Sequence, residues 1–146
     1  MLAAKAVTII KYIKLRLTMK FVLYTSVLNQ EHYDVLAVPE IVRTARVENS
    51  IHGITGVLLF DGLNFTQYFE GDEATVDRLL ANILRDKRHK NIVLVLTGHQ
   101  ESRLYHDWGM GYIDISDNAI DIGRCIAAAD FSVDVFKQKI SRLDVE

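Results

Sequence analysis

The stretch GITGVLLFDGLNFTQYFEG, residues 53–71, decides the fold. Residues 54–60 form a nearly continuous apolar run, and the side chains of residues 65–70 alternate between two faces. The dipeptide Asp61-Gly62 between these two segments is a typical hairpin turn. The stretch therefore predicts two neighbouring antiparallel strands joined by a tight turn.

A strand and a helix are predicted before this hairpin. Residues 19–26 (MKFVLYTS) are rich in residues that favour a strand, and residues 29–37 form a polar loop. Pro39 suits the first turn of a helix, where its missing N–H costs nothing. Apolar residues at helical spacing extend this helix to about Asn49.

A second helix and two strands are predicted after the hairpin. Asp72 supplies an N-cap, and the helix that follows has one apolar face. That face consists of Val76, Leu79, Leu80, Ile83 and Leu84. Residues 92–96 are fully apolar and predict a central strand, and residues 103–113 predict a fifth strand. In the tail, Asp130 or Ser132 caps a last short helix.

The element order is βαββαββ, and its first six elements are the ferredoxin-like split βαβ arrangement. The predicted fold class is α+β, with a four- to five-stranded mixed sheet, two helices on one face and two short C-terminal helices. We divide the chain into an N-terminal extension outside the fold (residues 1–18), one domain (residues 19–114) and a C-terminal helical extension (residues 115–146). The extension packs on the sheet or on a partner through an apolar stripe. That stripe consists of Val133, Phe136, Ile140 and Leu143.

Composition limits the classes of function. The chain has 146 residues, 49% of them hydrophobic, and a net charge of −2, which indicates one ordered domain. Residues 1–18 hold four cations and no acid, so the rest of the chain is acidic and a poor candidate for nucleic-acid binding. Lysines interrupt residues 1–18 too often for a membrane-spanning helix or a secretory signal. Because the chain has one cysteine, it forms no internal disulfide, and we predict a cytoplasmic location.

Three polar residues occur at positions that are apolar in the pattern. Gln67 lies between Phe65 and Phe69 on one face of its strand, and an unpaired buried amide costs about 1–3 kcal/mol in mutational measurements. Tyr24 and Asn49 end near the same region in the predicted topology. Either the three side chains converge between the sheet and the helices, or they are surface groups, with Gln67 facing water on the other side of the sheet.

Motifs for catalysis and metal binding are absent from the sequence. The five histidines lack the spacing of a metal site, and there is no nucleophile elbow, P-loop or dinucleotide-binding glycine motif. We therefore predict no enzymatic activity and no metal. Trp108 and Met110 share one face of the last strand, a pattern typical of core packing. The basic run at residues 86–90 is either a solvated helix end or a phosphate site made of side-chain cations.

Several short segments, in this order and without insertions, resemble the BLUF domain, a blue-light sensor that uses FAD. The segments are FVLYTS (21–26), the helix end at Asn49, GITGVLLF (53–60), FTQYFEG (65–71), DKRH (86–89) and WGM (108–110). The resemblance covers residues 19–113, the whole predicted βαββαββ unit. It implies a short-form, single-domain photoreceptor that binds FAD.

The resemblance also implies a role for each matching residue. Tyr24 matches the tyrosine that donates an electron and a proton to the photoexcited flavin. Gln67 matches the glutamine that bridges this tyrosine to flavin N5 and C4=O, and Asn49 matches the asparagine that holds C4=O and N3–H. Trp108 and Met110 match a mobile pair that reports the change in the glutamine.

The rest of the cofactor site is implied in the same way. Arg88 and His89, together with Asp86 of the same segment, match residues near the ribityl-phosphate side of the cofactor. Glu48 and Asn82 depart from the family pattern at the ring edge and near the phosphates. In the family, apolar residues line the ring between the two helices, and their matches here are Ile41, Phe65 and Ile83.

By this resemblance, light leaves Gln67 rotated or tautomerised, and the absorption of the flavin moves to the red. The last strand and the C-terminal helices then shift and signal to a downstream protein partner. The apolar stripe and the free sheet face are the candidate surfaces, and homo-oligomers through the sheet face are plausible. The alternative function is a flavin-free ferredoxin-like module that binds a small regulatory ligand. An acylphosphatase-like enzyme is disfavoured, because residues 24–32 contain no arginine for a phosphate loop.

Overall fold

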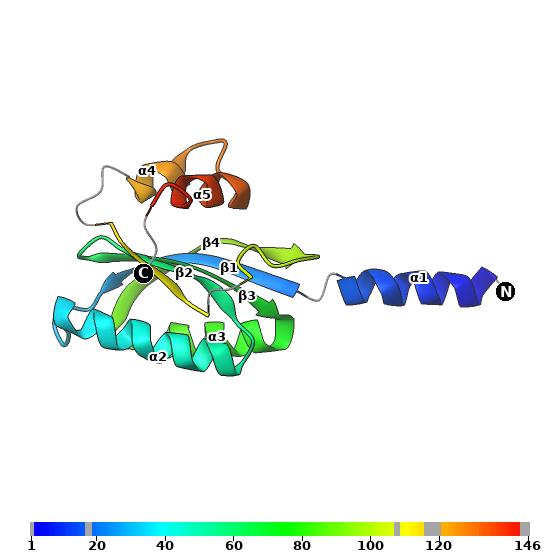
Figure 1. The fold of residues 1–146 in the computed structure, drawn as a ribbon, viewed down its shortest axis with the longest axis horizontal. Coiled ribbons are helices and arrows are strands. Elements are labelled where there is room, and N and C mark those ends of the chain that lie inside the picture. Colours follow the sequence, from blue (N-terminus) through cyan, green and yellow to red (C-terminus); the bar gives the residue numbers. More distant parts are fainter. Residues whose placement is uncertain (1, 17–18, 107–108, 116–120, 144–146) are drawn as a thin grey trace.

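The computed structural model describes residues 2–16, 19–106, 109–115 and 121–143 (Figure 1). The elements are α1 (Leu2–Arg16), β1 (Met19–Leu28), the 3₁₀ helix η1 (Val35–Ala37), α2 (Val38–Ile51), β2 (Thr55–Phe60), β3 (Asn64–Asp72), α3 (Glu73–Arg85), β4 (His89–Gln100), β5 (Gly111–Asp114), α4 (Ile122–Ala127) and α5 (Val133–Ile140). The predicted order βαββαββ and the two short helices after it are confirmed.

The strands form one sheet in the order β4-β1-β3-β2-β5. Strand β3 pairs antiparallel with β1 and β2, and β1 pairs antiparallel with β4, whereas β5 pairs parallel with β2. Helices α2 and α3 cover one face of this mixed sheet (Figure 1). The predicted α+β, ferredoxin-like sandwich is therefore confirmed, with five strands.

The hairpin turn between β2 and β3 is built as the sequence predicts. The side chain of Asp61 accepts hydrogen bonds from the two backbone N–H groups that follow Gly62, at 2.9 and 2.6 Å. Gly62 has a φ of +100°, a conformation that favours glycine. The turn fixes a register in which Gln67 of β3 lies opposite Leu58 on one side and Tyr24 on the other.

The prediction that residues 92–96 form a central strand is wrong. These residues belong to β4, which lies at an edge of the sheet beside β1. Ile92 packs with the apolar cluster on the α3 side, and Leu96 packs with the cluster on the opposite face. Each face of the strand thus supplies partly buried side chains to a core cluster, whereas Val93 and Leu94 between them are exposed, so an apolar run does not require a central position.

The strand predicted at residues 103–113 is shorter than expected, since only Gly111–Asp114 forms β5. The backbone N–H groups of Leu104 and Tyr105 donate to the carboxylate of Glu70, at 2.8 and 2.7 Å. A side-chain acceptor thus takes the place of a neighbouring strand. Residues 101–106 are irregular for this reason.

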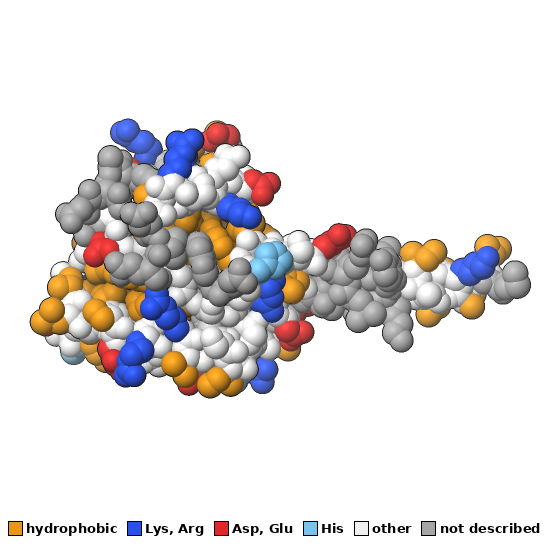
Figure 2. All heavy atoms as spheres, in the orientation of Figure 1, with side chains coloured by type: hydrophobic (Ala, Val, Ile, Leu, Met, Phe, Trp, Pro, Cys, Tyr) orange, Lys and Arg blue, Asp and Glu red, His pale blue; other side chains and the backbone are white. Residues whose placement is uncertain are grey.

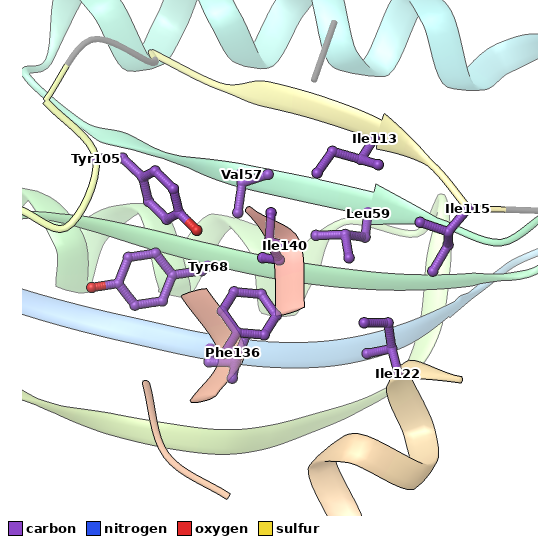
Figure 3. Packing of buried hydrophobic residues seen from close by; sticks show 10 residues of the cluster. Val57, Leu59, Tyr68, Tyr105, Ile113, Ile115, Ile122, Phe136 and Ile140 are labelled. Atoms are coloured by element: carbon purple, nitrogen blue, oxygen red, sulfur yellow. The ribbon is translucent and has the colours of Figure 1, made fainter. Parts of the chain in front are cut away.

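Helices α4 and α5 cover the second face of the sheet (Figure 1). Phe136 and Ile140 of α5 are each 1% exposed and pack in one cluster with Tyr68 of β3 (Figure 3). Ser132 is the N-cap of α5. The apolar stripe and this sheet face therefore pack against each other, which is one of the two alternatives given for the extension, and the expectation that they are free surfaces for a partner is corrected.

Helix α1 stands clear of the rest of the chain (Figures 1 and 2). Its exposed large apolar side chains are Leu2, Val7, Ile9 and Ile10. Within the described residues, no helix combines the length and the apolar character that crossing a bilayer requires. The division of the chain at residues 18 and 114 stays a prediction.

The packing of α5 gives a stability prediction. Phe136→Ala removes a fully buried ring and leaves a cavity, so we expect the free energy of unfolding to fall by about 3–5 kcal/mol. Lys137→Ala on the exposed side of the same helix is the control, with an expected change within about 0.5 kcal/mol. Urea unfolding followed by circular dichroism measures both. Equal stabilities for the two variants would show that α5 is not part of the core.

Candidate functional site

Tyr24 and Gln67 meet on the face of the sheet that α2 and α3 cover. The two residues are register partners on β1 and β3, and they are 4% and 7% exposed. The hydroxyl of Tyr24 donates a hydrogen bond to Gln67 Oε1. Phe65 and Phe69, on either side of Gln67, pack in clusters that contain residues of α2 and α3. The inward-facing alternative is therefore confirmed for both polar side chains.

The amide nitrogen of Gln67 contacts the segment that leads into β5. Gln67 Nε2 donates to the Met110 sulfur at 3.6 Å, and a thioether is a weak acceptor. Helix α2 holds the same segment, because Asn49 Nδ2 donates to the carbonyl of Gly109 at 3.1 Å and Arg46 Nε donates to the carbonyl of Met110 at 2.9 Å. Met110 is thus bonded from the sheet and from a helix.

Described residues line two cavities between the sheet and helices α2 and α3. The smaller one, of about 80 Å³, is lined by Tyr24, Ile41, Ala45, Leu58, Phe65, Gln67, Asp86, Arg88 and His89. The larger one, of about 310 Å³, is lined by Glu48, Asn49, His52, Ile54, Thr75, Arg78, Leu79 and Asn82. Ligand cavities usually measure roughly 300–1,000 Å³. A flat ring beside Gln67 therefore requires apolar side chains such as Ile41 to move apart.

Charged side chains line the smaller cavity where α3 ends. Arg88 and Asp86 form a forked ion pair, with Nε–Oδ1 at 2.9 Å and Nη2–Oδ2 at 2.5 Å. Partial burial opposes ionisation of Asp86, but the hydrogen bonds from Arg88 outweigh it and lower the pKa of this carboxyl. The guanidinium of Arg88 is partly exposed, so solvent reaches it beside its carboxylate partner.

His89 is held by the protein at both ring nitrogens. Its Nε2 lies 2.7 Å from the carbonyl oxygen of Ile83, and its Nδ1 lies 2.8 Å from Ser26 Oγ. A carbonyl oxygen only accepts, so Nε2 carries a proton. His89 therefore connects the end of α3 to β1. Because both ring nitrogens are hydrogen-bonded, only the ring carbons of His89 are available for contact in the cavity.

The surroundings of Tyr24 keep its phenol neutral. Burial raises the pKa of Tyr24 well above its ordinary value, the nearby carboxylate of Asp86 raises it further, and Arg88 partly opposes both effects. The proton of Tyr24 therefore stays between the phenol oxygen and Gln67 Oε1. A group of this kind releases its proton easily only when it also loses an electron.

A family model described as sensors of blue-light using FAD, BLUF, matches residues 19–111. The chain belongs to the BLUF family. The match spans the strands and helices that place Tyr24, Asn49, Gln67 and Met110, so the resemblance drawn from the short sequence segments is confirmed.

Curated relatives respond to light. The chain is 36% identical over 81 residues to the blue light- and temperature-regulated antirepressor BluF of Escherichia coli (strain K12), over 56% of this chain and 20% of that protein. It is 32% identical over 82 residues to the photoactivated adenylate cyclase subunit beta of Euglena gracilis, over 56% of this chain and 10% of that protein. The chain thus spans a fifth or less of the length of these relatives.

Solved BLUF structures superpose on most of the chain. BlrB, a BLUF protein in its dark state, has a TM-score of 0.74 at 27% identity, covering 87% of this chain and 98% of BlrB. BlsA in its photo-activated state has a TM-score of 0.69 at 27% identity, covering 86% of this chain and 94% of BlsA. The fold is therefore that of compact BLUF proteins of similar size.

The residues between the sheet and the helices fit a flavin. The buried amides of Gln67 and Asn49 face the two cavities, and the N–H group of Gln67 is bonded to a sulfur, which is a poor substitute for an oxygen or nitrogen acceptor. Ile41, Leu58 and Phe65 supply apolar walls. An isoalloxazine ring has the matching character, a flat apolar plate with one hydrogen-bonding edge.

Most of the predicted cofactor residues come together here. Seven of them line the smaller cavity, namely Tyr24, Ile41, Phe65, Gln67, Asp86, Arg88 and His89. Asn49 lines the larger cavity, together with the two departures Glu48 and Asn82. Ile83 packs in the apolar cluster that contains Tyr24. Trp108 lies outside the described residues. That these residues bind the cofactor stays a prediction.

The sequence analysis missed four residues around Gln67 and His89, and it also missed five that line the larger cavity, namely His52, Ile54, Thr75, Arg78 and Leu79. Ala45 follows Ile41 by one helical turn, so helical spacing places it on the same face. Ser26, the partner of His89, shares the face of Tyr24 by strand alternation. Leu58 and Arg46 carry no such local signal, because their contacts depend on the strand register and on the path of residues 109–110.

The buried phenol gives a prediction about alkaline stability. A pKa that is raised in the folded state contributes stability below the unfolded value, about 10, and this contribution is lost as the pH rises above it. Wild type should therefore lose stability faster than Tyr24→Phe above about pH 10, by about 1.4 kcal/mol per pH unit. Urea unfolding between pH 8 and pH 11 measures the difference. Parallel curves would mean that Tyr24 titrates in the folded protein as it does in the unfolded chain.

Proposed function

We propose that this chain is a blue-light photoreceptor in which FAD lies between α2 and α3, against Tyr24 and Gln67. The observation that carries the proposal is the hydrogen bond between the two side chains on neighbouring strands, buried at the wall of a cavity. Membership of the BLUF family supports it. A flavin-free module would have no use for a buried phenol and amide whose second partner is a sulfur.

FAD, when bound, supplies absorption of blue light and an excited ring that accepts an electron and a proton. Tyr24 is the donor in this scheme, since its phenol is held neutral and has one partner for its proton, Gln67 Oε1. Loss of an electron makes the phenol strongly acidic, so the proton leaves Tyr24 along this bond. The back reaction returns both to Tyr24, and the protein is not consumed.

Gln67 is the residue whose altered hydrogen bonding outlasts the electron and proton transfer. Moving a proton through its amide leaves the side chain rotated or tautomerised, and its contact with the Met110 sulfur at 3.6 Å cannot persist unchanged. Met110 is also held through its carbonyl by Arg46, and β5 begins at the next residue. The rearrangement of Gln67 is thereby passed to β5 and on to α4 and α5, which pack on the sheet.

Arg88 is the residue we assign to the phosphates of FAD. It is the partly exposed cation at the smaller cavity, and Asp86 holds it in an orientation suited to an anion. A solved structure of Klebsiella pneumoniae BlrP1 contains FMN. We assign FAD here because the matching family is described as using it.

The output is a change of shape that a partner protein reads. Curated relatives include an antirepressor and a cyclase subunit, so BLUF domains accompany different outputs, and we assign no catalytic activity to this chain. A cytoplasmic location and a protein partner, without nucleic acid or membrane, complete the proposal. Any homo-oligomer of this chain forms through surfaces other than the sheet face that α4 and α5 cover.

Tyr24→Phe tests the photochemical role. The variant keeps the ring and its packing but lacks the donor hydroxyl, so we expect it to bind FAD and to show no red-shifted state after blue light. Absorption spectra before and after illumination measure this, with wild type as the positive control. A normal light-induced shift in Tyr24→Phe would remove this residue from the mechanism. A colourless wild type that takes up no FAD would instead favour the flavin-free module.

Arg88→Ala tests the phosphate assignment. Removing one charge-assisted contact costs about 1.5–3 kcal/mol, so FAD should bind at least about tenfold more weakly. Riboflavin, which lacks phosphates, should bind to wild type and variant equally well. Flavin fluorescence quenching gives both dissociation constants. Equal weakening for the two ligands would mean that Arg88 acts on the shape of the cavity and not on a phosphate.

A further inference from the structure

A second buried polar residue of β3 lies on the face opposite Gln67. Glu70 is 0% exposed, and strand alternation places it on the face that α4 and α5 cover. Its carboxylate accepts five hydrogen bonds. The donors are Thr55 Oγ1 at 3.2 Å, Tyr68 Oη at 2.8 Å, Gln100 Nε2 at 2.6 Å, Leu104 N at 2.8 Å and Tyr105 N at 2.7 Å. Five donors around the two oxygens leave this group with no free acceptor position.

Among the residues that the structure describes, these donors and not a cation surround the carboxyl group. Arg103 approaches, but its guanidinium donates elsewhere: Nη1 to Thr55 Oγ1 at 2.9 Å and to the backbone carbonyl of Glu70 at 3.3 Å, and Nη2 to the carbonyl of Gly53 at 2.7 Å. Arg103 and Glu70 thus fasten residues 103–105 to the start of β2 and the end of β3. Removing an acceptor from such a buried network leaves its donors unpaired.

The segment between β4 and β5 is therefore held at both ends by one strand. Glu70 binds the backbone of Leu104 and Tyr105 on one face, and Gln67, three residues earlier, contacts Met110 on the other. When Gln67 changes, one end of the segment is released or pulled while the other end stays fixed. Because residues 104–105 stay in place, we expect a change at Met110 to displace β5 and not to be absorbed by movement of residues 104–105.

The same network touches the C-terminal helices. Tyr68, which donates to Glu70, has its ring centroid 5.8 Å from that of Tyr105 and 6.2 Å from that of Phe136 in α5. Figure 3 shows Tyr68, Tyr105 and Phe136 gathered in one cluster. The rings that support the fixed end of the segment are thus part of the packing beneath α5.

We propose that Glu70 is a positioning residue for signal output, which fixes residues 104–105 so that a change at Gln67 moves β5 and α5. This rests on the proposed function, because it needs a light-driven change at Gln67. It adds a residue that touches neither the cofactor cavity nor Gln67. Its loss should leave the photochemistry intact and uncouple it from the C-terminal helices.

Glu70→Gln in the flavin-loaded protein is the test, because the variant keeps the size of the side chain but replaces one acceptor with a donor. In the dark, hydrogen exchange at the amides of residues 104–105 should rise by about tenfold or more. The light-induced absorption shift should equal that of wild type. The light-minus-dark difference in hydrogen exchange over residues 133–140, present in wild type, should be lost.

Glu73→Gln is the matched control, an exposed glutamate near the start of α3 that pairs with His99, and it should behave as wild type in all three measurements. If Glu70→Gln does not fold, Tyr68→Phe removes one donor to the same carboxylate and keeps the ring, and it should lower the light-minus-dark difference. A normal absorption shift together with an undiminished difference in either variant would overturn the proposal. No absorption shift in wild type would instead refute the proposed function.

Discussion

The hydrogen bond between Tyr24 and Gln67 is the interaction on which the rest of the site depends. Two polar side chains lie opposite each other on neighbouring strands, beneath two helices, where each needs a partner because both are buried. The phenol satisfies the amide oxygen, and the amide nitrogen is left with a sulfur. The amide nitrogen of Gln67 therefore lacks a strong hydrogen-bond acceptor. A cofactor edge with its own donor and acceptor atoms fits at this position.

The alternation of β3 distributes the chemistry of the chain between two layers. Gln67 faces the helices that enclose the cavities, while Tyr68 and Glu70 face α4 and α5. One strand thus has its side chains in both layers, and it lies between β1 and β2 within the sheet. A rigid strand in this position allows two distant surfaces to respond to the same displacement without contact between them.

Local patterns in the sequence were sufficient for most of the fold. The hairpin, Pro39 at the start of α2 and the Asp72 cap are signals that operate within a few residues, and the structure has all three. The edge position of β4 was not predictable, because the strand supplies side chains to a core cluster on each face, as a central strand does, although Val93 and Leu94 are exposed. The late start of β5 was not predictable either. The backbone N–H groups of residues 104–105 donate to Glu70, more than thirty residues earlier in the chain, and not to a neighbouring strand. For the site, family resemblance added what pattern alone left open, the direction in which Gln67 points.

The sulfur of Met110 sets how easily the amide of Gln67 can turn. An oxygen acceptor at this position would hold the amide in one orientation, since breaking a strong hydrogen bond costs the amide much of its stabilisation. A thioether holds the N–H group weakly, so the two orientations of the amide differ little in energy as far as Met110 is concerned. The orientation of the amide therefore depends on its oxygen side, where the hydroxyl of Tyr24 donates to Oε1, and a change at that one bond alters the preference.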